Sequence, residues 1–289
     1  MITLESPKLR VRIRPVGAEY DSIVRLDTGL EYLWQGDPAW WDRKSPILFP
    51  FVGVSRGGQY TYEGRTYPMG GHGFAKDMPF ETVEQKPEKV RLRLASSEAT
   101  RAVYPFDFEL FVTYTVRDIT LSCEYEVVNR TAGDLYFSIG AHPGINLPLL
   151  PGESWADYDI VFEQRETADT WCFRNGGVQW QTEPCLEDTD TLPITPHMFD
   201  EDALIFKGLK SRYVSFAGRT NGHRVTMDFH RFPTLAFWSA GPDAPYICME
   251  PWCGHADMID HDGELTHKVD VERLLEGETF RVGYTLRLD

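Results

Sequence analysis

The sequence predicts an all-β protein, a large antiparallel β-sandwich with a few short helices. Apolar and polar residues alternate with a period of two in many segments, and 279–288 is a clear example. Helical periodicity is weak throughout. The 24 glycines and 19 prolines are spread along the chain instead of marking one linker. Many strands joined by turns and long loops are typical of a sandwich, and we expect one domain over 1–289.

The predicted strands follow from alternation or from apolar runs bounded by turn residues. Glu63 and Gly64 separate two short aromatic segments, which predicts a hairpin with glycine in its turn. Short helices are expected at 97–103, 202–209 and 271–275. Strands are expected at 8–14, 19–26, 60–62, 65–67, 89–94, 107–116, 119–128, 134–139, 158–164, 213–218, 224–229, 234–239, 244–250 and 279–288.

Charge and cysteine content narrow the possible functions. The formal net charge is −15, from 29 basic and 44 acidic side chains. Such a chain repels nucleic acid and anionic lipid, so neither is expected as a partner. The N-terminus lacks the pattern of a signal peptide, and no apolar stretch is long enough to span a membrane. Five cysteines without zinc-ribbon spacing suggest free thiols in a cytoplasmic protein. For the oligomeric state, we expect a monomer or a homodimer.

Glu250 is the most unusual residue of the sequence. It is a single carboxylate at the end of the apolar strand predicted over 244–250, and Pro251 and Trp252 follow it. Carboxylates are rare in such strands unless they are paired or functional. Burial would raise its pKa toward neutrality, as a general base requires. The alternative is a structural ion pair with an arginine.

Two histidines lie in glycine-flanked turns. His142 follows a predicted strand and precedes Pro143 and Gly144, while His72 lies among three glycines. Each could instead satisfy the backbone of a turn. Taken with Glu250, they suggest proton-transfer chemistry on a small polyol. Trp40 and Trp41 could stack on a sugar or pack into the sandwich.

Metal and cofactor sites are not expected. One polar segment has metal-ligand residue types, but its spacing matches neither a His-Glu-x-x-His helix nor an EF-hand. We therefore interpret it as a solvated loop. A zinc hydrolase with His72, His142 and Glu250 as ligands is a competing hypothesis, although these residues lie far apart in the chain. The residues of the polar segment are His255, Asp257, Asp260, His261, Asp262 and His267.

Six segments occur in an ordered series along the chain: Ile47-Leu48-Phe49-Pro50, the 60–69 hairpin, His72-Gly73-Phe74-Ala75-Lys76-Asp77, His142-Pro143, Asp202-Ala203-Leu204-Ile205-Phe206 and Glu250-Pro251-Trp252-Cys253-Gly254. With these segments, the chain resembles the aldose 1-epimerase (mutarotase) family from about residue 8 to its end. The resemblance implies a galactose-mutarotase-like fold and interconversion of the α and β anomers of a free aldose. It also implies that Glu250 is the general base, His142 the general acid and His72 a second active-site histidine, with Asp202 and Trp252 binding substrate.

Two positions depart from the family pattern. Relatives have a sugar-binding arginine where this chain has Val54, and commonly an arginine in place of Lys76. In an extended segment Arg56 would point to the same face as Val54, displaced by about 7 Å at roughly 3.3 Å per residue, and could replace that guanidinium. We therefore expect Arg56 and Lys76 to bind substrate. A carbohydrate-binding protein without catalysis and a hexose-6-phosphate 1-epimerase are the alternatives, and the identity of the sugar stays open.

Overall fold

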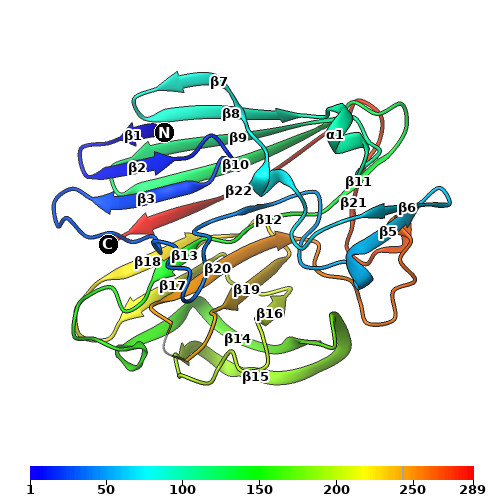
Figure 1. Ribbon diagram of the computed structural model, residues 1–289. Helices are drawn as coiled ribbons and strands as arrows, with labels where there is room; N and C mark the ends of the chain where they lie inside the picture. Colours follow the sequence, from blue (N-terminus) through cyan, green and yellow to red (C-terminus); the bar gives the residue numbers. More distant parts are fainter. Residues whose placement is uncertain (243) are drawn as a thin grey trace.

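One extended antiparallel sheet organises the protein in the computed structural model, which describes residues 1–242 and 244–289 (Figure 1). Additional pairs join β13 (Gly144–Asn146) to β20 and β15 (Gly177–Pro193) to β14. The order of strands across the sheet is β4 (Ile47–Leu48), β12 (Ile139–Ala141), β20 (Tyr246–Cys253), β19 (Thr234–Trp238), β16 (Leu204–Lys207), β14 (Tyr158–Arg174), β17 (Tyr213–Gly218), β18 (Arg224–Asp228), β22 (Thr279–Leu288), β10 (Thr120–Asn129), β9 (Phe108–Arg117), β8 (Lys89–Ala95) and β7 (Glu81–Lys86).

Three smaller sheets accompany the large one. They consist of β1 (Ile2–Glu5) with β2 (Leu9–Ile13) and β3 (Tyr20–Arg25), β5 (Gln59–Tyr62) with β6 (Arg65–Pro68), and β11 (Leu135–Phe137) with β21 (Glu272–Leu274). Helical structure is limited to α1 (Glu98–Arg101) and the 3₁₀ turns η1 (Arg56–Gly58), η2 (Ala75–Asp77), η3 (Trp155–Asp157) and η4 (Leu265–His267). Among the described residues, no helix is long and apolar enough to cross a membrane.

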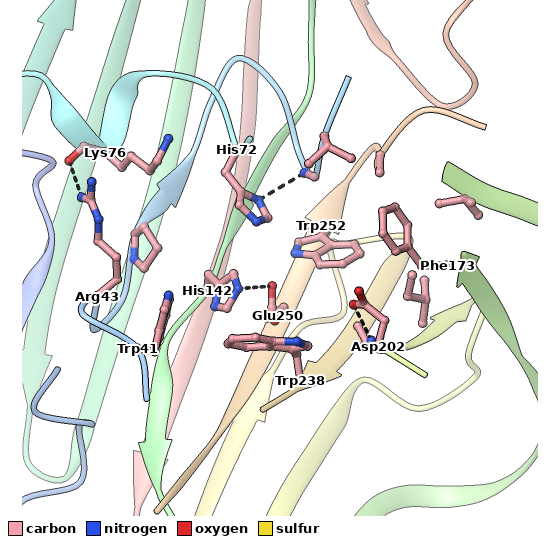
Figure 2. Close-up of a pocket in the computed structure, with 17 residues that line it drawn as sticks. Trp41, Arg43, His72, Lys76, His142, Phe173, Asp202, Trp238, Glu250 and Trp252 are labelled. Atoms are coloured by element: carbon pink, nitrogen blue, oxygen red, sulfur yellow. Dashed lines mark hydrogen bonds and ion pairs between the residues drawn. The ribbon is translucent and has the colours of Figure 1, made fainter. Parts of the chain in front are cut away.

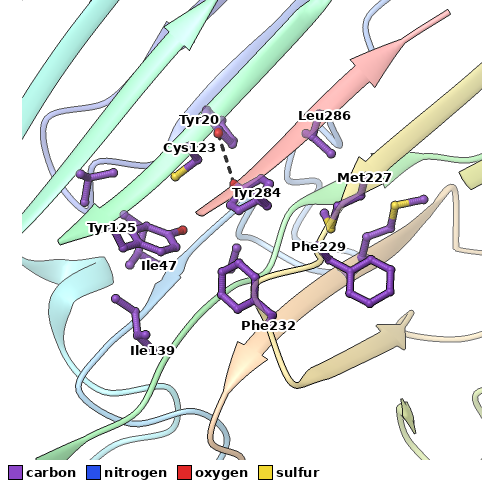
Figure 3. Close-up of a cluster of buried hydrophobic side chains, with 14 of the residues drawn as sticks. Tyr20, Ile47, Cys123, Tyr125, Ile139, Met227, Phe229, Phe232, Tyr284 and Leu286 are labelled. Carbon is purple, nitrogen blue, oxygen red and sulfur yellow. Dashed lines mark hydrogen bonds between the residues drawn. The ribbon is translucent and has the colours of Figure 1, made fainter. Parts of the chain in front are cut away.

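Alternating burial turns the sheet into a sandwich. In β9 every second residue is buried, from Phe108 to Val116, and β10 and β22 pair with it in a continuous antiparallel register. Because side chains alternate between faces, these strands cover one side of the core with apolar groups. The core includes tyrosines whose hydroxyls find partners: Tyr284 lies on β22 and donates to Tyr20 on β3 at 3.2 Å (Figure 3).

The all-β prediction is confirmed, and so is the hairpin, whose turn residues Glu63 and Gly64 have φ values of 50° and 74°. Of the three predicted helices, 97–103 contains α1. The helices predicted at 202–209 and 271–275 are wrong, because these segments pair as strands β16 and β21. Short apolar runs do not distinguish helix from strand without their pairing partners.

The long hairpin of β14 and β15 extends well beyond the strand predicted at 158–164. Beyond Phe162 most of its residues are exposed or half-buried, and its register shifts several times, so no simple alternation marks it in the sequence. The hairpin lies at the bottom of Figure 1, far from β7 and β8 at the top. It supplies one wall of the cavity described below.

Candidate active site

A cavity of about 340 Å³ opens beside β20, and its walls are mainly apolar (Figure 2). It collects residues from distant parts of the sequence: the 41–54 segment, the 72–76 loop, the β12–β13 turn and the strands β14, β15, β16, β19 and β20. The lining residues are Trp41, Arg43, Pro46, Gly53, Val54, His72, Lys76, His142, Phe173, Val178, Asp202, Ala203, Ile205, Trp238, Glu250, Trp252 and Ala256.

Glu250 lies within β20, and not at the end of a strand as the sequence suggested. The strand continues through Pro251 to Cys253, since residues 248–252 pair with β19 and Cys253 pairs with Ile139 of β12. The cross-strand partner of Glu250 is Ala236, whose small side chain leaves space in front of the carboxylate. Glu250 is 1% exposed. A sheet strand therefore fixes the carboxylate rigidly at the wall of an apolar cavity.

His142 lies in the turn between β12 and β13, and its imidazole faces Glu250. Its Nε2 lies 3.2 Å from Oε2 of Glu250. Aromatic rings hold the imidazole: the ring centroid of Trp41 is 4.8 Å away and that of Trp238 is 5.7 Å away. Nδ1 of His142 and Oε2 of Glu250 complete no hydrogen bond to any described residue. Both groups thus keep unused hydrogen-bonding capacity next to the cavity.

Burial pushes the two groups toward their neutral forms. It raises the pKa of Glu250 well above the ordinary value, and the nearby Asp202 carboxylate adds to this shift while Trp252 opposes it. Burial also lowers the pKa of His142 well below 6.5, and His72 contributes. Both shifts favour the uncharged forms, a protonated carboxyl group beside a neutral imidazole.

His72 is held by its own loop. Its backbone N–H donates to the carbonyl of Gly53 at 2.7 Å, and its Nδ1 accepts from the Gly53 N–H at 3.1 Å. The neutral ring therefore carries its proton on Nε2. Burial lowers the pKa of His72 to about 4. The next residue, Gly73, has a φ of 67°, and a side chain there would collide with the Phe49 carbonyl.

The basic residues at one end of the cavity are Arg43 and Lys76. Nζ of Lys76 donates to the carbonyl oxygens of Gly71, at 2.8 Å, and Gly73, so it braces the His72 loop. Arg43 donates to the Lys76 carbonyl at 3.3 Å and pairs with the carboxylate of Asp77. Asp77 also lies 3.6 Å from Nζ of Lys76. One carboxylate thus neutralises part of the positive charge at this end.

The extended geometry assumed for Arg56 is wrong. The residue begins the 3₁₀ turn η1, and its backbone N–H donates to Asp257 at 2.9 Å. Its guanidinium donates to the carbonyl of His261 at 3.3 Å, and Arg56 does not line the cavity. Val54 does line it, and the arginine there is Arg43. Sequence reasoning missed Arg43, since nothing in its local pattern shows that the 41–46 segment folds over the site.

The remaining walls are polar at one point and aromatic elsewhere. Asp202, whose φ is 98°, precedes β16 and lines the cavity, where its Oδ1 accepts from the Ala203 N–H at 2.7 Å. Trp252 lies on the same face of β20 as Glu250 and packs over Gly140, where a Cβ would come within 2.7 Å of its ring. Trp41 lines the cavity too, whereas Trp40 is 38% exposed. Phe173 and Trp238 were not expected from the sequence.

We predicted a solvated loop for the polar segment at 255–267, but the structure buries part of it. His255 and Asp257 are each 2% exposed, and Asp257 pairs with buried Lys268 at 2.5 Å. Tertiary contacts that the sequence does not reveal cover this part of the chain. The zinc ligand set considered from the sequence also differs from the observed grouping. Among the described residues, the three groups within reach of one metal ion are His142, Cys248 and Glu250, without His72.

Comparisons with known proteins give matches along nearly the whole chain. The family model described as aldose 1-epimerase matches residues 1–283. The chain is 32% identical to chromosomal protein LacX of Lactococcus lactis subsp. lactis, with 99% of each chain covered. A galactose mutarotase related enzyme from Lactobacillus acidophilus superimposes with a TM-score of 0.96 at 32% identity, covering 100% of this chain and 97% of that one. A galactose mutarotase-like protein from Lactobacillus casei gives 0.94 at 31% identity, with both chains fully covered.

Proposed function

Because the chain belongs to the aldose 1-epimerase family, we propose that it interconverts the α and β anomers of a free aldose by acid–base ring opening and closure. The observation that carries the proposal is the buried pair of Glu250 and His142, 3.2 Å apart at the wall of an apolar cavity. A purely carbohydrate-binding site has no need for an acid and a base in contact.

The pair matches the reacting atoms of a cyclic sugar. The anomeric hydroxyl and the ring oxygen are bonded to the same carbon, so two closely spaced groups can serve both. Glu250 takes the proton of the anomeric hydroxyl, and that oxygen becomes the aldehyde carbonyl. The bond between the anomeric carbon and the ring oxygen breaks, and the ring oxygen receives its electron pair and the proton of His142. Rotation of the aldehyde and the reverse steps yield the other anomer.

The proton count explains how the resting site takes part. Ring opening needs Glu250 ionised and His142 protonated. The resting pair reaches this state when one proton moves from Glu250 to His142. Opening then returns the proton to Glu250 and leaves His142 neutral, which are the forms that burial favours. The total number of protons on the pair never changes. The proton transfers in the transition state of ring opening therefore convert the charged pair into the uncharged pair that burial favours.

The remaining cavity residues are suited to hold a neutral sugar. Trp41, Trp238 and Trp252 offer aromatic faces, and sugar C–H groups pack well on such surfaces. Nε2 of His72 carries a proton that can be donated to a sugar oxygen, and Asp202 can accept from a hydroxyl. Because Asp77 pairs with Arg43 and lies near Lys76, it weakens the attraction of this end of the cavity for a phosphate. The free aldose is accordingly preferred to a hexose 6-phosphate.

Polarimetry of freshly dissolved α-glucose and α-galactose tests the proposal. We expect the wild-type protein to speed equilibration and Glu250→Gln to lose about a hundred- to ten-thousand-fold of that rate, the range for one acid–base group. Binding of the sugar, measured by calorimetry, should survive in the variant, because Gln keeps the shape and one acceptor oxygen. Equal equilibration rates for wild type and variant would rule out Glu250 as the base.

A further inference from the structure

Cys248 adds a third metal-ligand type to the acid–base pair. It lies two residues before Glu250 on β20, and alternation along the strand points both side chains to the same face. A ring nitrogen of His142, Sγ of Cys248 and a carboxylate oxygen of Glu250 all lie within 4.8 Å of one another. All three residues are buried, and the proposed reaction makes no use of the thiol.

A second observation shows that the cluster has unused ligand capacity. Oε2 of Glu250, the oxygen that faces Nε2 of His142, is fully buried and completes no hydrogen bond to a described residue. Buried polar atoms without a partner are uncommon and mark places where a ligand can bind. Glu250 and His142 also line the cavity, so an ion can reach the cluster from solvent.

The geometry is close to that of a tetrahedral site. With metal–ligand bonds of about 2.0 Å to nitrogen or oxygen and about 2.3 Å to sulfur, neighbouring ligand atoms lie roughly 3.3 to 3.6 Å apart. The contact between His142 and Glu250, 3.2 Å, already has this length. The thiol, within 4.8 Å, needs to approach by about 1 Å, which rotation of the cysteine and glutamate side chains can supply.

We propose that His142, Cys248 and Glu250 bind one thiophilic divalent cation of the Zn²⁺ type, with the fourth coordination position open to water in the cavity. Charge balance favours the site, because a thiolate from Cys248 and a carboxylate from Glu250 together offset the two positive charges of the ion.

Bound metal would stop the proposed reaction, and this consequence rests on the proposed function. Glu250 and His142 cannot exchange protons with a sugar while both coordinate the ion. The metal is therefore an inhibitor and not a resident cofactor, and the acid–base chemistry needs none.

Titration of the purified, chelator-treated, reduced protein with Co²⁺ tests the site independently of activity. We expect visible d–d bands of tetrahedral intensity and an ultraviolet thiolate-to-cobalt charge-transfer band, both removed by one equivalent of Zn²⁺. Cys248→Ala should lose the charge-transfer band and bind Co²⁺ at least about tenfold more weakly. Cys253→Ala is the matched control, because this buried cysteine lies on the same strand but points to its other face.

Several results would overturn the proposal. They are the absence of a charge-transfer band in the wild type, a band that survives in Cys248→Ala, or one that disappears equally in Cys253→Ala. Thermal unfolding of both variants without metal shows whether the fold is retained, and Cys248→Ser offers a second polar variant if Cys248→Ala is unstable.

Activity provides the second part of the test. Zn²⁺ should slow equilibration of the sugar by the wild type and by Cys253→Ala, and the ratio of rates with and without Zn²⁺ should move toward one in Cys248→Ala. Full activity with Zn²⁺ bound would refute inhibition. If the protein has no epimerase activity at all, the proposed function fails while the cobalt spectra still decide the metal site.

Discussion

Two buried carboxylates, Glu250 and Asp257, lie close together in the chain and meet opposite surroundings. Glu250 is 1% exposed and faces the imidazole of His142 at the wall of the cavity. Asp257 is 2% exposed, pairs with the ammonium of Lys268 at 2.5 Å and accepts the backbone N–H of Arg56 at 2.9 Å. Asp257 is thus fully partnered and structural, whereas Glu250 can hold or release a proton.

The comparison shows what a buried acid needs in order to be functional. A carboxylate paired with a buried ammonium group stabilises the fold only while the pair is complete. A carboxylate next to another group that can be neutral retains a choice of protonation states. The sequence suggested an ion pair as the alternative role for Glu250, and the structure has such a pair at Asp257 instead.

The largest effect on stability is expected from Asp257→Asn. The substitution leaves the Lys268 ammonium buried without a counter-charge, which costs about 3 to 5 kcal/mol for a buried pair. Urea unfolding at neutral pH measures the loss. The matched variant is Glu250→Gln, which imitates the protonated carboxyl group and should change the free energy of unfolding by less than about 1 kcal/mol. Similar losses in both variants would abolish the distinction between the two carboxylates.

The neutral form of the His72 imidazole is also favoured in the folded protein, so this residue should make the fold less stable in acid. Its pKa is about 4 in the folded protein and 6.5 ordinarily, so the unfolded chain takes up a proton first as the pH falls. Its contribution is therefore present above pH 6.5 and is lost progressively as the pH falls to about 4, by up to about 3 kcal/mol.

Urea unfolding of the wild type and of His72→Gln across this pH range measures that loss. The glutamine oxygen can still accept the Gly53 N–H but does not titrate, so the variant should lose less stability in acid. Identical pH dependence in the two proteins would show that His72 does not contribute.

The smallest effect is expected at the basic end of the cavity. Arg43→Met should raise KM for the aldose about tenfold, the loss of one hydrogen bond from a charged donor, and leave kcat within about twofold. Arg56→Met is the control: its guanidinium lies outside the cavity and should not affect KM. A larger KM effect for Arg56→Met than for Arg43→Met would reverse the assignment. Unfolding curves show whether loss of the contacts of Arg43 with Asp77 and Lys76 alters the fold.

Local patterns accounted for much of the fold. The alternation in β9, β10 and β22 follows from the two faces of a strand, and Glu63-Gly64 favours a tight hairpin wherever it occurs. The long β14–β15 hairpin was underestimated, because its outer half is exposed and its register is irregular. Likewise, the segment at 204–207 forms a strand by pairing with β19 on one side and β14 on the other.

By itself, the sequence determined the all-β class, the family and the residue types available for acid–base chemistry. These properties depend on side-chain order along the chain, which alternation and ordered motifs record directly. Tertiary structure alone decided that Nε2 of His142 lies 3.2 Å from Glu250, that Arg43 reaches the cavity while Arg56 does not, and that Cys248 joins the cluster. Such distances depend on the pairing of strands far apart in the chain, and no local pattern encodes them.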